Sequence, residues 1–421
     1  MDLIASDRKY IWHPFTPQKS MPDPIAIVKG KASLLYDEND NAYIDAISSW
    51  WVTLHGHAHP YIASTLFEQA SKLEQVIFAG FTHEPAVRLA ENLIRILPDS
   101  ISKIFYSDNG STSTEVALKM AIQYWWNKEE THRKTILAFE DSYHGDTIGA
   151  MSVSDRSVFT APFNDYLLNI EFVPTPNKEN IERITEQIKN RQDIAAFIYE
   201  PLVQGAGGMK MYDAKFLDQI LSELKKNETI CIADEVMTGF YRTGKLFASE
   251  YSDQTPDIIC LSKGLTGGTM ALGVTACAHK IYDAFLSDDK RKTFFHGHSF
   301  TANPLACAVA NASLELLENA ETILTVEKIG AFNQKAKTEL ENYSVVQNCR
   351  TLGTILAFEI NKGKNEYLNS ISNEVTSFAL KNNVYLRPLG NTVYWMPPYC
   401  ITDDELEKIF SVVKEFIVSV Q

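Results

Sequence analysis

The sequence has 421 residues, 45% hydrophobic and 22% charged, which is typical of a soluble globular protein of two or three domains. Its 39 basic and 53 acidic side chains give a net charge of −14, which argues against a general nucleic-acid binder because that function needs a basic surface. No apolar stretch approaches the ~18 to 20 residues of a membrane span and residues 1–10 lack a signal-peptide core, so we expect a cytoplasmic protein that does not bind membranes.

The first 55 residues predict a small β meander, with short strands at Ile25–Val28, Leu34–Tyr36 and Tyr43–Ile44. From about residue 56, helical periodicity alternates with short apolar, β-rich runs, which is typical of a largely parallel sheet covered by helices. We expect helices at Thr114–Asn127, Ile181–Lys189 and Lys215–Lys225, and strands at Lys134–Glu140, Ile194–Glu200, Thr229–Val236, Asp257–Leu261 and Leu272–Ala278.

A long helical pattern at Leu305–Asn319 leads into a mixed α+β region that reaches the C-terminus. We therefore predict an α/β fold whose large domain, residues 56–305, contains a mainly parallel sheet flanked by helices. A smaller α+β domain would be built from both chain ends, residues 1–55 and 306–421. The six cysteines are scattered without a CxxC pair, so we interpret them as reduced, mostly buried thiols.

Two ionisable residues stand at the ends of predicted strands. Strand periodicity places Asp234 and Val236 on one face, and a carboxylate at the carboxyl end of a buried strand has the usual ligand position of open α/β folds. Lys263 follows the next apolar run, although lysine avoids burial unless it is paired or used chemically. A pyridoxal-phosphate (PLP) enzyme needs both: a lysine that forms an imine with the cofactor aldehyde and an acid on the pyridine nitrogen, with Val236 against the flat ring. Taken singly, Asp234 would more often be a cap or turn residue and Lys263 a solvated lysine.

Three loops add possible ligand contacts. Gly110 and Ser111 precede a predicted helix and would let a phosphate approach its free N–H groups, although an ordinary N-cap explains the same residues. Tyr143 follows a strand and could stack on a ring or be an ordinary loop residue. His296 and His298 have no carboxylate or cysteine at ligand spacing, so we predict no metal site.

Together these segments resemble the class III aminotransferases, which are PLP-dependent enzymes of fold type I that move an amino group. The resemblance runs from Trp12 to about Thr402, and residues 200–208 and 234–244 look like family signatures. Further segments are similar to the branch of the family that aminates 8-amino-7-oxononanoate to 7,8-diaminononanoate in biotin synthesis, usually with S-adenosylmethionine as amino donor. These segments are 12–14, 48–51, 143–147, 265–269 and 396–399.

The resemblance implies a PLP site shared between two subunits of a homodimer. Lys263 would carry the cofactor and move the proton, Asp234 would hold the pyridine nitrogen, and Tyr143 would stack on the cofactor and touch the substrate. Many members have Pro-Thr where this chain has residues 298–299, but serine keeps the hydroxyl that phosphate binding needs. The residues expected at the phosphate are Gly110 and Ser111 of one subunit and His298 and Ser299 of its neighbour.

The resemblance also implies a substrate pocket. Arg387 would bind the substrate carboxylate, because its planar donors match a carboxylate bidentately, although by itself it would equally be a surface arginine. Members that use S-adenosylmethionine carry tyrosine at the position of Phe15, whereas relatives that use lysine tend to carry phenylalanine. The pair Trp50–Trp51 favours S-adenosylmethionine, because an aromatic face suits a sulfonium cation. The other expected pocket residues are Tyr143, Lys263, Gly297 and Tyr394.

Several alternatives remain open at this point. The same acceptor could receive its amino group from lysine, or the chain could be another ω-aminotransferase acting on acetylornithine or 4-aminobutyrate. The Trp50–Trp51 pair and Arg387 weigh against the second of these alternatives. A PLP-dependent racemase, aminomutase or decarboxylase is a further alternative. A homologue that binds PLP without turnover is the most remote, because Asp234, Lys263 and Arg387 are all intact.

Overall fold

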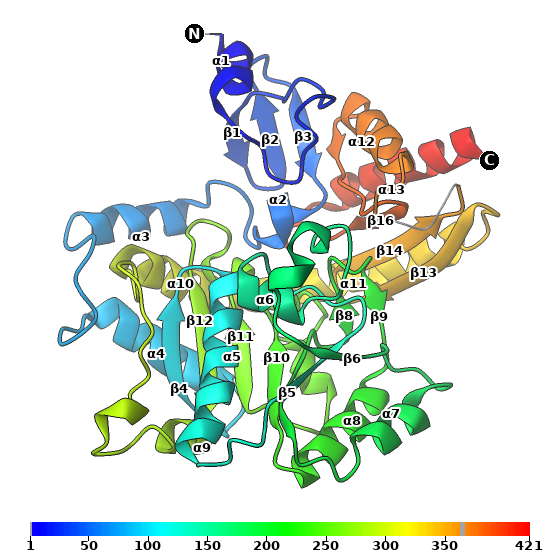
Figure 1. The fold of residues 1–421 in the computed structure, drawn as a ribbon. Helices are drawn as coiled ribbons and strands as arrows, with labels where there is room; N and C mark the ends of the chain where they lie inside the picture. The colour runs from blue at the N-terminus through cyan, green and yellow to red at the C-terminus, as the bar shows by residue number, and fades with distance from the viewer. Residues whose placement is uncertain (1, 363–366) are drawn as a thin grey trace.

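Seven strands form the central sheet of the larger part of the molecule in this computed structural model, which describes residues 2–362 and 367–421 (Figure 1). The strand order is β4-β12-β11-β10-β7-β5-β6. Neighbouring strands from β11 to β6 are parallel, whereas β12 is antiparallel to both β11 and β4. The strands are β4 (Ile101–Ser107), β5 (Thr135–Phe139), β6 (Glu171–Val173), β7 (Ile194–Tyr199), β10 (Ile230–Asp234), β11 (Ile258–Leu261) and β12 (Gly273–Ala278).

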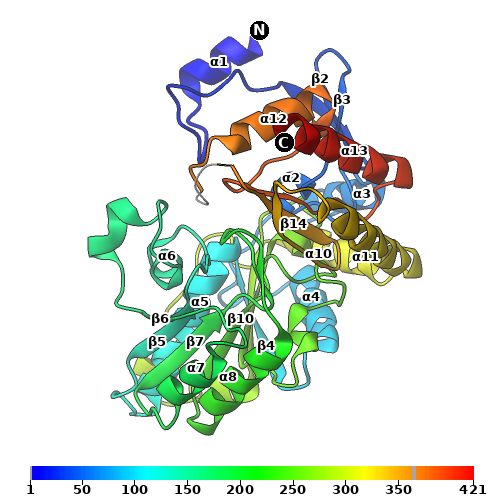
Figure 2. The ribbon, with the colours of Figure 1, turned by 90° about the vertical axis from the view of Figure 1, so that its right-hand side faces the viewer.

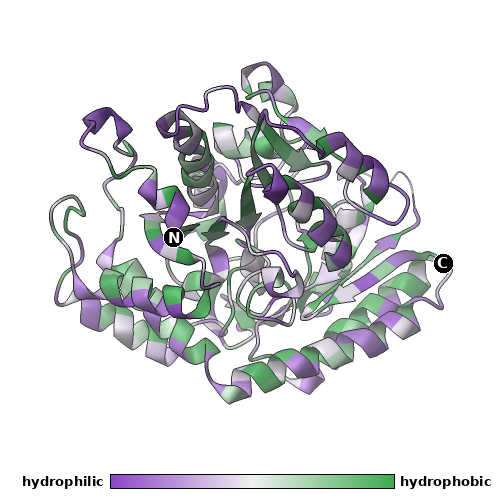
Figure 3. Cartoon of the chain, turned by 90° about the horizontal axis from the view of Figure 1, so that it is seen from below, coloured by the Kyte–Doolittle hydropathy of each residue, from purple (hydrophilic) through white to green (hydrophobic). Residues whose placement is uncertain are grey.

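The inner strands β7, β10, β11 and β12 are buried on both faces, which explains their largely apolar sequence. Successive residues alternate between two cores: Ile232 and Ile258 lie in one, and Ala233 and Ile259 lie in the other. Helix α5 (Gly110–Asn127) covers the first face, while α4 (Glu84–Ile96) and α8 (Ala214–Lys226) pack into the core on the second. Figure 3 shows the central strands in green and much of the purple on outer helices and loops. The predicted α/β fold with a mainly parallel sheet flanked by helices is confirmed.

The local predictions differ from the structure in several places. The strand predicted to reach Val236 ends at Asp234, and the helix predicted from Thr114 begins at Gly110. That helix starts earlier because Asn109 caps it in a capping box with Thr112. The sequence did not indicate β4 or β6, and periodicity could not show that β12 runs antiparallel to β11.

A four-stranded sheet of order β1-β2-β3-β15 brings the two ends of the chain together (Figure 2). The predicted meander is confirmed, and β15 adds to it in parallel with β3. The limits of the predicted domains, at residues 55 and 305, stay predictions. Residues 1 and 363–366 of the predicted small domain lie outside the residues that the structure describes. The strands are β1 (Ile27–Lys31), β2 (Leu34–Asp37), β3 (Ala42–Asp45) and β15 (Val384–Tyr385).

The remaining elements surround these two sheets. A three-stranded antiparallel sheet consists of β13 (Val346–Leu352), β14 (Ile355–Ile360) and β16 (Thr392–Trp395), and a short pair consists of β8 (Val203–Gln204) and β9 (Lys210–Met211). In the described ranges, no helix combines the length and apolarity needed to cross a membrane. The other α-helices are α1 (Leu3–Tyr10), α2 (Ser48–Trp51), α3 (Pro60–Ala70), α6 (Ile148–Val153), α7 (Ile181–Ile188), α9 (His279–Asp283), α10 (Pro304–Leu317), α11 (Ala320–Leu340), α12 (Ile371–Lys381) and α13 (Asp403–Val420).

Candidate active site

Asp234 and Lys263 lie at the same edge of the central sheet. Asp234 is the last residue of β10 and pairs in register with Cys260 of the parallel strand β11. Lys263 follows β11 directly and begins the 3-10 helix Lys263–Thr266. Because both strands end at this edge, the two side chains stand where open α/β sheets bind their ligands.

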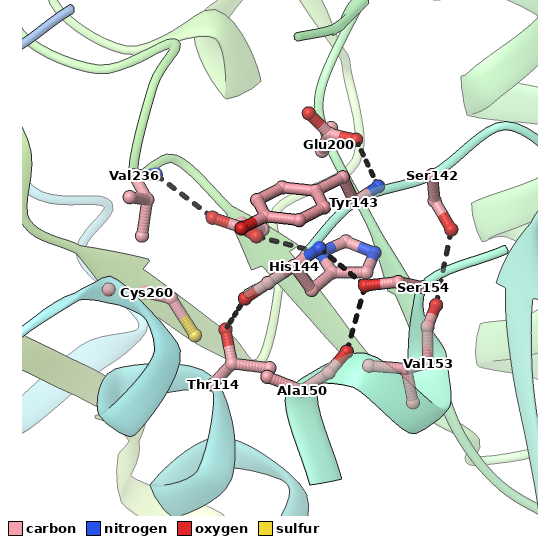
Figure 4. Close-up of polar contacts among 12 residues, drawn as sticks. Thr114, Ser142, Tyr143, His144, Ala150, Val153, Ser154, Glu200, Val236 and Cys260 are labelled. Atoms are coloured by element: carbon pink, nitrogen blue, oxygen red, sulfur yellow. Dashed lines mark hydrogen bonds and ion pairs between the residues drawn. The ribbon is translucent and has the colours of Figure 1, made fainter. Parts of the chain in front are cut away.

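The Asp234 carboxylate is buried and held on both sides. Its Oδ1 accepts the backbone N–H of Val236 at 3.0 Å, and its Oδ2 lies 2.7 Å from Nδ1 of His144 (Figure 4). The His144 side chain is fully buried, and its Nε2 has no hydrogen-bond partner among the described residues. The sequence left His144 as a loop residue, although it follows Tyr143 directly.

Lys263 places its amine in a buried setting without a hydrogen bond or ion pair to any described residue. Its Nζ lies 4.6 Å from the ring centroid of Trp51, and its backbone has a φ of 44°, which is uncommon for a non-glycine residue. Burial lowers the pKa of Lys263 to about 8, against the opposing effects of the carboxylates of Asp234 and Glu200. An amine with this pKa is partly neutral near pH 8 and can act as a nucleophile or a base.

Glu200 fixes the backbone of the loop that carries Tyr143. Its Oε1 accepts the N–H of Tyr143 at 3.0 Å (Figure 4). Its Oε2 accepts the N–H of Gly205 at 2.8 Å. Burial raises the pKa of Glu200 to about 7, and burial followed by the nearby Asp146 carboxylate raises the pKa of the Tyr143 hydroxyl. Sequence reasoning missed this role for Glu200, since nothing local indicates which loops its two oxygens join.

Gly110 and Ser111 form the first turn of α5 beside this edge of the sheet. A Cβ at Gly110 would lie 2.7 Å from Cγ1 of Val236, and a Cβ at Gly145 would lie 2.1 Å from Oγ of Ser111. The Ser111 Oγ accepts the N–H of Asp146 at 3.2 Å. Glycine is therefore required at both positions for the loops to approach, and the helix N-terminus between them suits a phosphate.

These residues fit the PLP cofactor that the family resemblance implies. A half-buried lysine without an acidic hydrogen-bond partner among the described residues, a buried carboxylate oriented by His144 and a glycine-lined helix N-terminus stand at one sheet edge. They correspond to an amine for the cofactor aldehyde, an acid for its pyridine nitrogen and N–H donors for its phosphate.

The residues predicted for the substrate pocket also come together, apart from Gly297. The Arg387 guanidinium carbon lies 4.9 Å from the Trp50 ring centroid, and the rings of Trp50 and Phe15 are 5.4 Å apart. The buried Tyr394 on β16 accepts a hydrogen bond of 2.9 Å from Nε1 of Trp51. Arg387 forms no ion pair or hydrogen bond with another described residue.

The backbone around Trp50 and Trp51 is strained. Ser48, Ser49 and Trp51 all have φ values near +60°. The Ser49 N–H donates to Asp45 at 2.6 Å, and the Ser48 hydroxyl donates to the carbonyl of Met396 at 2.7 Å. Such backbone persists only where its surroundings hold it, and it is often found at ligand sites.

Gly297, His298 and Ser299 do not join this group within one chain. They lie in the segment before α10, where the His298 N–H donates to Thr301 and the carbonyl of Ser299 accepts from Gln75. No hydrogen bond connects them to Asp234 or Lys263 among the described residues. Their predicted contact with a neighbouring subunit stays a prediction.

A cavity of about 350 Å³ opens next to Tyr143. Its walls include two aromatic residues that the sequence did not indicate, Phe159 and Tyr367. They come from segments more than 200 residues apart, so no local pattern could have paired them. Polar lining is supplied by Asp146, Arg156 and Asn391, among others.

Comparison with known proteins agrees with this geometry. The chain matches the class III aminotransferase family over residues 15–417. It is 47% identical to a protein of Synechococcus elongatus, covering 97% of this chain and 98% of that one, and 40% identical to a protein of Helicobacter pylori, covering 97% and 95%. Both carry the name adenosylmethionine-8-amino-7-oxononanoate aminotransferase.

Solved structures give the same result. The enzyme of that name from Methanocaldococcus jannaschii superposes with a TM-score of 0.94 at 32% identity, covering 98% of each chain. A PLP-bound amine transaminase from an uncultivated Pseudomonas species gives a TM-score of 0.91 at 28% identity, covering 97% of this chain and 98% of that one. The chain therefore belongs to the class III aminotransferases and is a PLP-dependent aminotransferase.

Proposed function

We propose that this enzyme transfers an amino group to the ketone of 8-amino-7-oxononanoate, forming 7,8-diaminononanoate for biotin synthesis, with S-adenosylmethionine as donor. The observation that carries the proposal is the position of Arg387 on the face of Trp50, with no ion pair to another described residue. A series of aromatic rings connects Trp50 to Tyr143. The acceptor has a matching shape, since a methylene chain separates its carboxylate from its reacting ketone. Arg387 would bind the carboxylate, and the rings would pack against the methylene chain.

At the cofactor, the roles follow from the surroundings of each side chain. PLP, when bound, supplies the electron sink that acidifies the carbon bearing the amino group. Lys263 would hold the cofactor covalently, and its amine, released when a substrate amine takes its place, would move a proton between substrate and cofactor carbons. Because burial lowers its pKa to about 8, a useful fraction of this amine is neutral near neutral pH.

The other cofactor contacts would keep the ring in place. Asp234, oriented by His144, would accept a hydrogen bond from the pyridine nitrogen. Tyr143, whose backbone Glu200 holds, would stack on the ring with Val236 on the opposite side. The backbone N–H groups of Gly110 and Ser111 would bind the phosphate.

Free lysine is the second candidate for the amino donor, because Phe15 favours it over S-adenosylmethionine. The names of the relatives and the Trp50–Trp51 pair support S-adenosylmethionine. The PLP-loaded protein should be incubated with 8-amino-7-oxononanoate and each donor separately, and 7,8-diaminononanoate measured by mass spectrometry. We expect the diamine with S-adenosylmethionine. Product with lysine alone would reassign the donor, and no product with either would overturn the proposed function.

We further propose that the enzyme is a cytoplasmic homodimer in which His298 and Ser299 reach the phosphate of the neighbouring subunit's cofactor. The exposure of the flanking Phe295 and Phe300, 74% and 62%, supports a contact surface there. Sedimentation should give a dimer. Mixing Lys263→Ala subunits with His298→Ala/Ser299→Ala subunits should restore activity above that of either variant alone, because a hybrid dimer has one intact site. A monomer with full activity would contradict the proposal.

A further inference from the structure

Phe159 connects three separate parts of the chain at the substrate side of the site. Its ring centroid lies 4.5 Å from that of Tyr367, 5.7 Å from that of Phe15 and 6.2 Å from that of Tyr143. Phe15 belongs to the N-terminal segment, Tyr143 to a loop of the large sheet and Tyr367 to the segment before α12. We call Phe15, Phe159 and Tyr367 the Phe159 cluster. It forms a wall beside the residue that would stack on the cofactor.

Within the Phe159 cluster, only Tyr367 carries a hydroxyl. Tyr367 lines the 350 Å³ cavity together with Tyr143, Asp146 and Asn391. It forms no hydrogen bond with another residue that the structure describes. Next to the dominant effect of burial, Tyr367 is among the groups that raise the pKa values of Tyr143 and Tyr394, so its phenol is close enough to both to affect them. The hydroxyl is therefore available to a ligand in this cavity.

The residues that line the cavity indicate which substrate the Tyr367 hydroxyl serves. Arg387 and Trp50 contact each other and are not among the lining residues, and they suit a carboxylate attached to an apolar chain, as in the acceptor. Asp146, Arg156 and Asn391 give the cavity itself a polar lining, which suits the polar groups of an amino-acid donor.

We propose that Tyr367 is a specificity-determining residue that hydrogen-bonds the amino-acid donor and supplies, from the C-terminal part of the chain, the hydroxyl that Phe15 lacks. Phe159 sets its position, because its ring separates Phe15 from Tyr367 and contacts both. The proposal rests on the proposed function only in requiring an amino-acid donor in this cavity.

The test compares Tyr367→Phe with the unchanged enzyme in the donor half-reaction. Single-turnover absorbance of the bound cofactor gives a donor dissociation constant and a maximal rate, with S-adenosylmethionine and lysine as separate probes. For the donor that reacts, we expect the dissociation constant to rise about 3- to 10-fold, as for one lost hydrogen bond, while the maximal rate changes less than about twofold. The KM of the acceptor should not change.

Two further variants separate recognition from packing. Phe15→Tyr/Tyr367→Phe should bring the donor dissociation constant back to within about twofold of the original value. Tyr166→Phe, at a ring that is 78% exposed, is the matched control and should change nothing. Donor binding to the PLP-loaded Lys263→Ala protein, measured by calorimetry, gives the same comparison without turnover.

Three results would overturn the proposal: unchanged donor affinity in Tyr367→Phe, equal weakening of donor and acceptor together with a lower melting temperature, or no recovery in the double variant. The proposed function fails separately. If 8-amino-7-oxononanoate is not aminated while Tyr367→Phe still weakens the donor, the acceptor is wrong and the role of Tyr367 stands.

Discussion

The two ends of the active site are built in different ways. The cofactor end consists of the buried His144, Glu200 and Asp234 and the half-buried Lys263. Its two carboxylates are fixed by directional hydrogen bonds at strand ends of one sheet. The substrate end consists of Trp50, Arg387 and the Phe159 cluster. It comes from five distant parts of the sequence and is held by ring and cation–π contacts at partly exposed positions.

This difference indicates which part of the enzyme can change. Removing the hydrogen-bond partner of a buried polar group lowers the stability of the folded protein by about 1 to 3 kcal/mol. The cofactor end therefore tolerates little substitution. An aromatic contact contributes about 0.5 to 1.5 kcal/mol beyond its buried area and demands less exact geometry. The contacts at the substrate end should therefore change more easily than those at the cofactor end.

The largest effect is expected from Lys263→Ala. Removing the amine should lower kcat at least ~10³-fold, because both the covalent hold on the cofactor and the moving proton depend on it. The purified protein should also lose the visible absorbance of lysine-bound cofactor. Lys178→Ala, at an exposed position, is the control and should keep both. A fully active Lys263→Ala enzyme would remove Lys263 from this role.

Asp234→Asn should lower kcat by roughly 10²-fold. The amide has the size of the carboxylate but no charge, so it cannot hold the pyridine nitrogen in its protonated form, and a charge-assisted hydrogen bond is lost. Steady-state kinetics with saturating PLP measures this loss. Asp165→Asn, on an exposed residue, should retain the original rate. Equal rates for the two variants would mean that Asp234 only holds the backbone of Val236 and the ring of His144 in place.

At the substrate end, Arg387→Lys should raise the KM of the carboxylate-bearing acceptor about 10- to 100-fold, since lysine keeps the charge but not the two parallel donors. A primary amine without a carboxylate should react at the original rate in the donor half-reaction. If both substrates weaken equally, Arg387 does not select for a carboxylate.

The smallest effect concerns the stability of the cofactor-free protein. Folding lowers the pKa of Lys263 from 10.5 to about 8, so below pH 8 the folded state must keep a buried charge that the unfolded state solvates. Stability should therefore rise with pH between about 8 and 10.5. Lys263→Met should stabilise the cofactor-free protein by on the order of 1 to 3 kcal/mol at pH 7, and by less at pH 10.

Urea unfolding at the two pH values measures this difference. Lys178→Met, at an exposed site, should stay within about 0.5 kcal/mol of the original protein at both. A pH-independent gain for Lys263→Met would show that the burial of its charge has no measurable cost.

By itself, the sequence determined the parts that depend on neighbouring residues. Apolar runs predicted five strands of the large sheet, and their ends placed Asp234 and Lys263 at one edge, because the carboxyl ends of parallel strands meet there. The match to family motifs then predicted PLP and the aminotransferase family, both of which are confirmed.

Only the tertiary structure decided the contacts between distant segments. The hydrogen bond from His144 to Asp234 spans 90 residues, and the contact of Phe159 with Tyr367 spans more than 200. The antiparallel direction of β12 and the presence of β4 at the sheet edge were equally hidden. The physical reason is that periodicity and capping act over a few residues, whereas these contacts exist only once the sheet and both chain ends have packed together.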